Sequence, residues 1–374
     1  MKKYCIAAIL GLICTPAFAG EFVYDYSLIA DGFYGYTQYA DKYRHLYHRN
    51  NTPISTEIST SAGYDFGNKR MITLGIDAQV AHGKEIKDYN HGDWGENVYL
   101  SLTSEYGELS VGQIYNAAYQ MAVGAPTIGY FRVNNTPMTD FIANPNWQRR
   151  GKITSYRTLN STYLNTDADA LKASYVTPEF YGTKLALSYT PDSYSRAGLI
   201  NKKSRYDNRS SYAVGVYNNT DWGFAEAESS LGYAYNHKNN QEVSAGLSLY
   251  RKGWTLGGSY RKSFTSSKDY ALNIRDAENM LYYFDGYRRG QAFNVGLGYE
   301  IGPFKTGVSY FAAYADKTNN RDEVVSFVNR YSFNKYAAIY LAVAYAEYKG
   351  DKALEEGNRG CAAIGGLEFS IQGQ

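Results

Sequence analysis

The residues that most often carry catalysis or bind metals form no convincing site in this sequence. His45 and His48 have a spacing that suits a metal site, but an arginine flanks the pair on each side and disfavours a bound cation. Gly296-x-Gly298 lies inside a predicted strand, whereas a dinucleotide fingerprint lies at a strand-to-helix turn. No Gly-x-Ser-x-Gly nucleophile motif is present. We therefore expect no enzyme activity, no metal site and no cofactor.

The remaining candidates for a functional role are charged side chains that could attract or repel ions. Basic residues dominate the stretch 119–164, in which Asp140 is the only carboxylate. Charges gathered in this way attract ions of one sign and repel ions of the other. The elements that hold these charges decide whether they face water, lipid or a packed core.

Short stretches that alternate apolar and polar residues recur along residues 22–371, and about sixteen of them can be counted. In 254–261, for example, Trp254, Leu256 and Tyr260 fall on one face, while threonine, serine and arginine fall on the other. The second face carries many glycines, serines and threonines with interspersed charges, as the wall of a water-filled lumen would. The pattern predicts an all-β fold whose strands have one apolar face and one polar face in contact with water.

The apolar runs are too short for membrane helices. The longest one after the N-terminal region, 336–346, would reach only about 16 Å as a helix, against a hydrocarbon core of roughly 30 Å. As a tilted strand it would cover about 25 Å, the height of an outer-membrane apolar band. Tight turns, as at 67–69, alternate with longer polar segments, as at 83–94 and 264–290. We therefore predict a transmembrane antiparallel β-barrel of about sixteen strands, with short turns on one rim and long loops on the other.

The N-terminus has the features of a secretory signal. Lys2 and Lys3 precede an apolar run at 6–13, and Ala17-Phe18-Ala19 supplies a small-residue cleavage site. This predicts a signal peptide at 1–19 and a barrel at 20–374. Cleavage would leave Cys361 as the single cysteine, so no internal disulfide could form. The net charge of +2 gives no reason to expect a nucleic-acid partner.

Two segments resemble parts of the Gram-negative general porins, which are trimeric, sixteen-stranded outer-membrane channels. Gly107-Glu-Leu-Ser-Val-Gly-Gln-Ile-Tyr-Asn-Ala-Ala-Tyr119 resembles the strand that leads into the porin constriction loop, and Ala173-Ser-Tyr-Val-Thr-Pro-Glu-Phe-Tyr-Gly182 resembles the hairpin after that loop. The resemblance covers essentially the whole mature chain. It implies a homotrimer in the outer membrane of a Gram-negative bacterium, in contact with lipid and lipopolysaccharide, through which small hydrophilic solutes and ions diffuse passively. The chain departs from the family in running past Phe369 to Gln374, because such porins usually end on an aromatic residue.

The resemblance also implies where the pore is narrowed. It makes 119–169 the third long loop, folded into the lumen as the constriction. The residues expected at the constriction are Tyr130, Arg132, Asp140, Arg149, Arg150, Lys152 and Arg157. The residues expected on the pore wall are Asp31, Glu57, Asp77, Gln113, Lys172, Lys184, Arg261, Lys305 and Arg330. Because the loop is basic and the wall partly acidic, the usual porin polarity is partly reversed, and we expect a mild anion bias.

Three alternatives remain open from the sequence. The barrel could be an adhesin or a structural protein that acts through external loops, such as the tyrosine-rich 264–290. Residues 153–164 alternate weakly, and with a second extra strand they would give an eighteen-stranded, substrate-specific porin. A secreted soluble β protein is the third, and heat-modifiable gel mobility with detergent dependence would exclude it.

Overall fold

The structure is a computed structural model of the whole chain. It describes residues 20–39, 50–52, 54–82, 97–128, 141–142, 158–159, 161–164, 167, 170–191, 210–236, 240–264, 290–316, 320–350 and 357–373.

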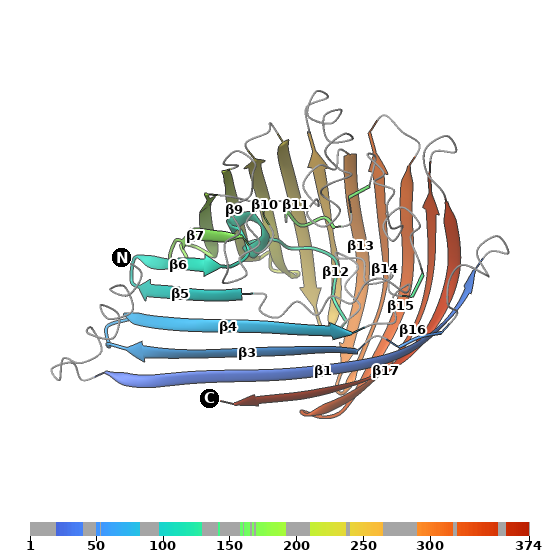
Figure 1. Ribbon diagram of the computed structural model, residues 1–374, viewed down its shortest axis with the longest axis horizontal. Helices are drawn as coiled ribbons and strands as arrows, with labels where there is room; N and C mark the ends of the chain where they lie inside the picture. The colour runs from blue at the N-terminus through green and yellow to red at the C-terminus, as the bar shows by residue number, and fades with distance from the viewer. Residues whose placement is uncertain are drawn as a thin grey trace.

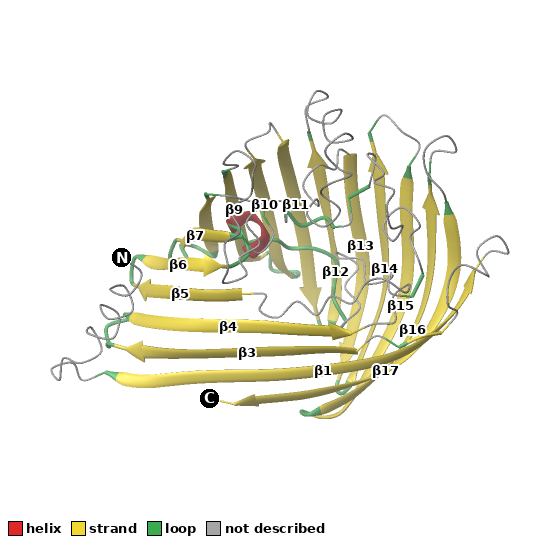
Figure 2. Cartoon of the chain, viewed as in Figure 1, coloured by secondary structure: helices red, strands yellow, loops and turns green. Residues whose placement is uncertain are grey.

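Most of the described chain is β-strand, as Figure 2 shows. The strands are β1 (Glu21–Tyr39), β2 (Asn50–Asn51), β3 (Ile54–Asp65), β4 (Met71–His82), β5 (Asn97–Ser104), β6 (Gly107–Gln113), β7 (Leu171–Val176), β8 (Thr183–Thr190), β9 (Ser211–Asp221), β10 (Glu226–Asn236), β11 (Asn240–Arg251), β12 (Trp254–Ser263), β13 (Gly290–Ile301), β14 (Phe304–Ala315), β15 (Arg321–Asn334), β16 (Ala337–Lys349) and β17 (Asn358–Gly373). A single short helix, α2 (Ala117–Gln120), lies in the described part of the chain. No described helix is long and apolar enough to span a membrane.

The strands form one closed antiparallel barrel in which each strand pairs with its neighbours along the chain (Figure 1). β1 closes it, because residues 21–32 pair with β3 and residues 26–39 pair with β17. β2 is two residues long and pairs with β1 just before β3 begins, so it extends β3 rather than adding a strand. The barrel therefore has sixteen strands, which confirms the predicted fold class.

The eighteen-stranded alternative is wrong. It required 153–164 to supply an extra strand, but the described residues of that stretch, 158–159 and 161–164, belong to no strand of the barrel. They lie inside a connection that packs against the sheet instead.

Tight turns join the strands in pairs at one rim. Between β3 and β4, Gly67, Asn68 and Lys69 all have positive φ, at 75°, 52° and 61°. The Asp65 carboxylate accepts a hydrogen bond from the Gly67 N–H (2.7 Å), which fixes the start of this turn. The segregation of short turns to one rim agrees with the rhythm of turns and loops in the sequence.

The two faces of each strand differ sharply. In β16, Leu341 and Val343 are 61% and 57% exposed, whereas Ala342 and Ala344 are 4% and 2% exposed. The first pair points out of the barrel and the second pair points in, because successive side chains of a strand alternate. A band of exposed Leu, Ile, Val and Tyr around the outside matches the lipid-facing surface of a membrane barrel.

Candidate pore and its lining

The connection between β6 and β7, residues 114–170, lies against the inner wall where it is described. Figure 1 shows its helix α2 inside the curve of the sheet, next to β7 and β9. Asn116 caps this helix, because its Oδ1 accepts a hydrogen bond from the Tyr119 N–H (2.9 Å). The Asn116 amide also donates to the Leu164 carbonyl (2.8 Å) and to the Asp167 carboxylate (2.7 Å). The beginning and the end of the connection are therefore tied to each other.

Residues 121–128 then cross the inner faces of β10 to β14. The Val123 N–H donates to the Ser230 hydroxyl (2.9 Å), and the Ser248 hydroxyl donates to the Gly124 carbonyl (2.6 Å). The Ala125 N–H donates to the side-chain oxygen of Asn294 (3.3 Å). These bonds satisfy backbone groups that have no ladder partner, since the segment runs across the strands.

Further along, Phe141 and Ile142 are completely buried, and the Thr37 hydroxyl of β1 donates to the Phe141 carbonyl (2.7 Å). On the return path, the Thr158 hydroxyl donates to the carboxylate of Asp322 in β15.

Closer to β7, the Thr162 hydroxyl lies 2.7 Å from that of Ser259 in β12 and accepts from the Asn294 amide of β13 (3.0 Å). Asp167 accepts from the Thr190 hydroxyl of β8 (2.6 Å). The described parts of the connection thus contact the inner wall from β8 round to β15 and at β1.

The residues predicted for the constriction fall outside the described residues. They are Tyr130, Arg132, Asp140, Arg149, Arg150, Lys152 and Arg157. Their positions in the pore stay predictions. The same holds for His45 and His48, and for nearly all of the external segment 264–290.

The predicted wall residues Asp31, Glu57 and Asp77 share the inward face of β1, β3 and β4. In β1, Ile29 lies two residues before Asp31 on the same face and pairs with Glu57 of β3. Ser59, two residues after Glu57, pairs with Asp77 of β4, so the three carboxylates lie on the same face of the sheet. No lysine or arginine occurs in β1, β3, β4, β5 or β6. We call the inward faces of these five strands the acidic wall.

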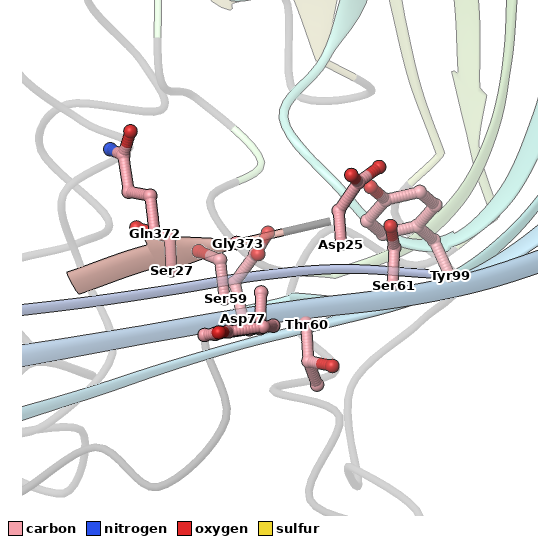
Figure 3. A pocket seen from close by; sticks show the side chains of 10 residues that line it. Asp25, Ser27, Ser59, Thr60, Ser61, Asp77, Tyr99, Gln372 and Gly373 are labelled. Carbon is pink, nitrogen blue, oxygen red and sulfur yellow. The ribbon is translucent and has the colours of Figure 1, made fainter. Parts of the chain in front are cut away.

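A shallow pocket lies beside the acidic wall, between β1, β3 to β5 and the end of β17 (Figure 3). Figure 3 shows Asp25, Ser61 and Tyr99 pointing to one side of the sheet and Thr60 to the other. The lining residues are Asp25, Tyr26, Ser27, Ser59, Thr60, Ser61, Asp77, Tyr99, Gln372 and Gly373. Within the described residues no three His, Cys, Asp or Glu side chains are close enough to hold a metal ion. The pocket therefore offers hydroxyls and separate carboxylates to water and ions.

The remaining strands, β7 to β17, hold the predicted basic wall residues, and these have acidic neighbours. Arg330 forms an ion pair with Glu368 (2.5 Å), and the Tyr340 hydroxyl donates to the same carboxylate (2.5 Å). Near the turns, Lys305 pairs with Glu300 (2.9 Å) and Lys184 pairs with Glu179 (3.4 Å). Each inward positive charge in these pairs is partly compensated within the wall.

Two of the predicted wall residues anchor the connection instead of facing open lumen. Lys172 is 1% exposed and donates to the carbonyls of Ile114 (2.5 Å) and Ala170 (2.8 Å). Arg261 is 2% exposed and donates to Glu242 (2.6 Å) and to the Tyr163 carbonyl (2.6 Å). Both side chains lie on the inward face, where the β6–β7 connection covers them, and their role in the pore wall stays a prediction.

Gln113 requires a correction. It pairs with Val98 at the end of β6, and alternation puts it on the same face as Val111, which is largely exposed on the outside of the barrel. The inward residues of β6 are Glu108, Ser110 and Gly112, so Gln113 does not belong to the pore wall.

The polar anchors of the connection were not predicted from the sequence. They are Asn116, Asp167, Ser188, Ser230, Ser248 and Asn294. A signal was available, because small polar residues and glycines alternate on the inward faces of consecutive strands, as in Ser230-Leu231-Gly232 and Gly246-Leu247-Ser248. That pattern alone does not say what the small residues accommodate.

Comparison with known proteins shows which family this barrel belongs to. A family profile described as Gram-negative porin matches residues 6–351. No curated protein sequence matches the chain. Among solved structures, the chain is similar to the anion-selective porin from Comamonas acidovorans, with a TM-score of 0.58, 13% identity and coverage of 94% of this chain and 100% of that one.

Two further structures are similar. Salmonella typhi OmpF in complex with daunomycin has a TM-score of 0.61 and 11% identity over 93% of this chain and 97% of that one. The in-vitro folded trimer form of Vibrio cholerae OmpT has a TM-score of 0.55 and 12% identity over 94% and 100%. At these identities the structures show a shared fold, and the family profile shows the membership. The chain belongs to the Gram-negative porin family and forms an outer-membrane channel for passive diffusion.

Proposed function

We propose that the loop 119–169 narrows this porin channel and sets which solutes pass. The observation that carries the proposal is the path of residues 117–128, which cross the inner faces of β9 to β14 with backbone groups hydrogen-bonded to Ser230, Ser248 and Asn294. A loop held there occupies space that would otherwise belong to the lumen, and pore width is a main filter for uncharged solutes.

The test is swelling of liposomes that contain the refolded protein, with sugars of increasing size. We expect swelling rates to fall steeply with sugar size, as in a channel with a narrow eyelet. A permeability that falls no faster than free diffusion through a wide barrel would contradict the proposal.

For ion selectivity, we propose that the basic loop faces the acidic wall across the pore. Arg132, Arg149 and Arg150 would stand at the narrowest level, where the field of fixed charges acts most strongly on passing ions. Asp31, Glu57 and Asp77 oppose them from a wall without lysine or arginine. A mild anion bias follows, kept small by the carboxylates.

A planar bilayer under a salt gradient measures this bias through the sign of the reversal potential. Replacing the three loop arginines by glutamine should move the reversal potential towards cation selectivity. The control, Lys305→Gln, removes a positive charge that already pairs with Glu300 near a turn, and should move the reversal potential much less for each charge removed. Equal shifts per charge removed in the two variants would contradict a special role for the loop arginines.

We further propose that the mature protein begins at Gly20 and is a homotrimer in contact with lipid and lipopolysaccharide. Support for trimers comes from the trimer form of Vibrio cholerae OmpT, which has a similar fold. The exposed apolar band around the barrel supplies surface for lipid and for neighbouring subunits. Chemical cross-linking of the refolded protein should give a ladder that ends at three subunits, and a monomer as the sole product would contradict this.

No catalytic activity is part of the proposal. The family and the fold are those of channels, and the inward faces hold hydroxyls, carboxylates and ion pairs that suit water and ions.

A further inference from the structure

The inner wall carries a row of glycines where residues 117–128 cross it. Each of the strands β9 to β14 contributes at least one: Gly215, Gly232, Gly246, Gly257, Gly296 and Gly307. Their pairing registers place them on inward faces, and several stand opposite a serine of the neighbouring strand, as Gly246 does with Ser230 and Gly257 with Ser248. We call this row the glycine seat.

The segment lies so close to the seat that side chains there would collide with it. A Cβ added at Gly246 would stand 1.9 Å from the Val123 carbonyl oxygen, and one at Gly215 would stand 2.4 Å from the Ala117 carbonyl oxygen. At Gly257 the Gly124 carbonyl oxygen would be 2.5 Å away, and at Gly307 the Ile128 side chain 2.6 Å away. Ordinary contact begins at 3.4 Å, so the segment occupies the volume that side chains would fill.

The geometry of the crossing fits an extended chain laid across strands. From Val123 at β11 to Ile128 at β14 the segment passes three strand spacings, about 14 Å at roughly 4.8 Å each, and an extended chain of that length can span about 17 Å. The segment also has small side chains here, in Ala122-Val-Gly-Ala-Pro126. Small residues therefore meet the seat glycines from Ala122 to Pro126.

Serine and asparagine side chains next to the seat hold the segment in place. Ser230 accepts from the Val123 N–H, and Ser248 donates to the Gly124 carbonyl. Each bond comes from a residue two positions from a seat glycine, so one inward face both makes room for the segment and fastens it.

We propose that the glycine seat, with Ser230 and Ser248, is the positioning device that sets how far the loop stands out from the wall and hence how wide the pore is. This inference rests on the proposed role of the loop as the constriction. Adding one methyl group at Gly246 would require the Val123 backbone to move by about 1.5 Å to restore ordinary contact, the difference between 1.9 and 3.4 Å. Most of that movement is directed into the lumen, since the barrel wall blocks the other direction.

The experiment compares Gly246→Ala with Gly32→Ala in the refolded protein in planar bilayers. Gly32 lies in β1, and a Cβ added there meets nothing within 4 Å, so this control adds the same methyl group without touching the loop. We expect Gly246→Ala to fold with heat-modifiable mobility but to lose single-channel conductance and to pass large sugars more slowly, while Gly32→Ala matches the parent. If Gly246 served only to stabilise the fold, Gly246→Ala would lower the stability of the barrel and leave its conductance unchanged.

A folded Gly246→Ala channel with the conductance and sugar cut-off of Gly32→Ala would overturn the inference. If Gly246→Ala does not fold, Ser230→Ala serves instead, because it removes the partner of the Val123 N–H and adds no atoms. Its control is Ser229→Ala, on the outward face of the same strand. We expect a changed conductance for Ser230→Ala only, and equal conductances would overturn the inference. A parent protein that passes no current would instead contradict the channel itself.

Discussion

Arg261 and Lys262 are neighbours in β12, and the structure predicts very different consequences for their loss. Arg261 points inward and forms an ion pair with Glu242 (2.6 Å), with both side chains almost completely buried at 2% and 1% exposure. Lys262 points outward and pairs with Asp316 (2.9 Å), where both side chains keep contact with solvent. The two pairs have similar geometry and differ mainly in burial.

Arg261→Ala should lower the free energy of unfolding by about 3–5 kcal/mol, because it leaves the Glu242 carboxylate buried without a counter-charge. It also removes the donor to the Tyr163 carbonyl (2.6 Å) and so loosens the returning part of the β6–β7 connection. Lys262→Ala should cost about 0.2–1 kcal/mol, the usual range for an exposed pair.

The assay is denaturant unfolding of the refolded barrel in detergent micelles, followed by tryptophan fluorescence. The double variant Arg261→Met with Glu242→Leu tests the cause, since replacing both partners by apolar residues of similar size is often nearly neutral. We expect the double variant to recover most of the free energy of unfolding that Arg261→Ala loses. An Arg261→Ala protein as stable as Lys262→Ala, or a double variant less stable than Arg261→Ala, would contradict a cost set by the buried, unpaired Glu242.

Three other predictions concern the wall, the helix cap and the outer surface. Asp77→Asn on the acidic wall should shift the reversal potential towards anions, by at most about fivefold in permeability ratio since a unit charge at 4 Å in water contributes about 1 kcal/mol; no shift would mean that the acidic wall does not face the ion path. Asn116→Ala should cost about 1 kcal/mol or more, because it removes the cap of α2 and the bonds to Leu164 and Asp167; denaturant unfolding measures this, and an unchanged midpoint would contradict it. Leu341→Arg should cost about 2–4 kcal/mol in lipid vesicles, as for a charge on the lipid face of a barrel; a variant as stable as the parent would argue that this face meets water.

The strands could be predicted from the sequence because two independent patterns agree on them. Alternation predicts a strand at 254–261, and β12 is Trp254–Ser263. The turn predicted at 67–69 forms with three residues at positive φ. A one-residue shift of register would turn every apolar side chain inward, so a strand with one lipid face is strongly specified.

The interior was harder to predict, because its chemistry depends on what the β6–β7 connection covers. Alternation placed Lys172 and Arg261 on the inward face, but it could not show that the connection buries them. Gln113 was expected on the wall because of the family resemblance, whereas the alternation of β6 puts it on the outward face together with Val111. The glycine seat was visible only as scattered glycines, since the segment that it accommodates has no periodic pattern of its own.

The most direct test of this account is the single-channel conductance of the refolded mature protein in a planar bilayer. We expect stepwise increases of current on insertion, with steps that Gly246→Ala reduces and Gly32→Ala leaves unchanged. A folded, inserted protein that passes no current would contradict the open channel, and the external loops would then be the place to look for its function.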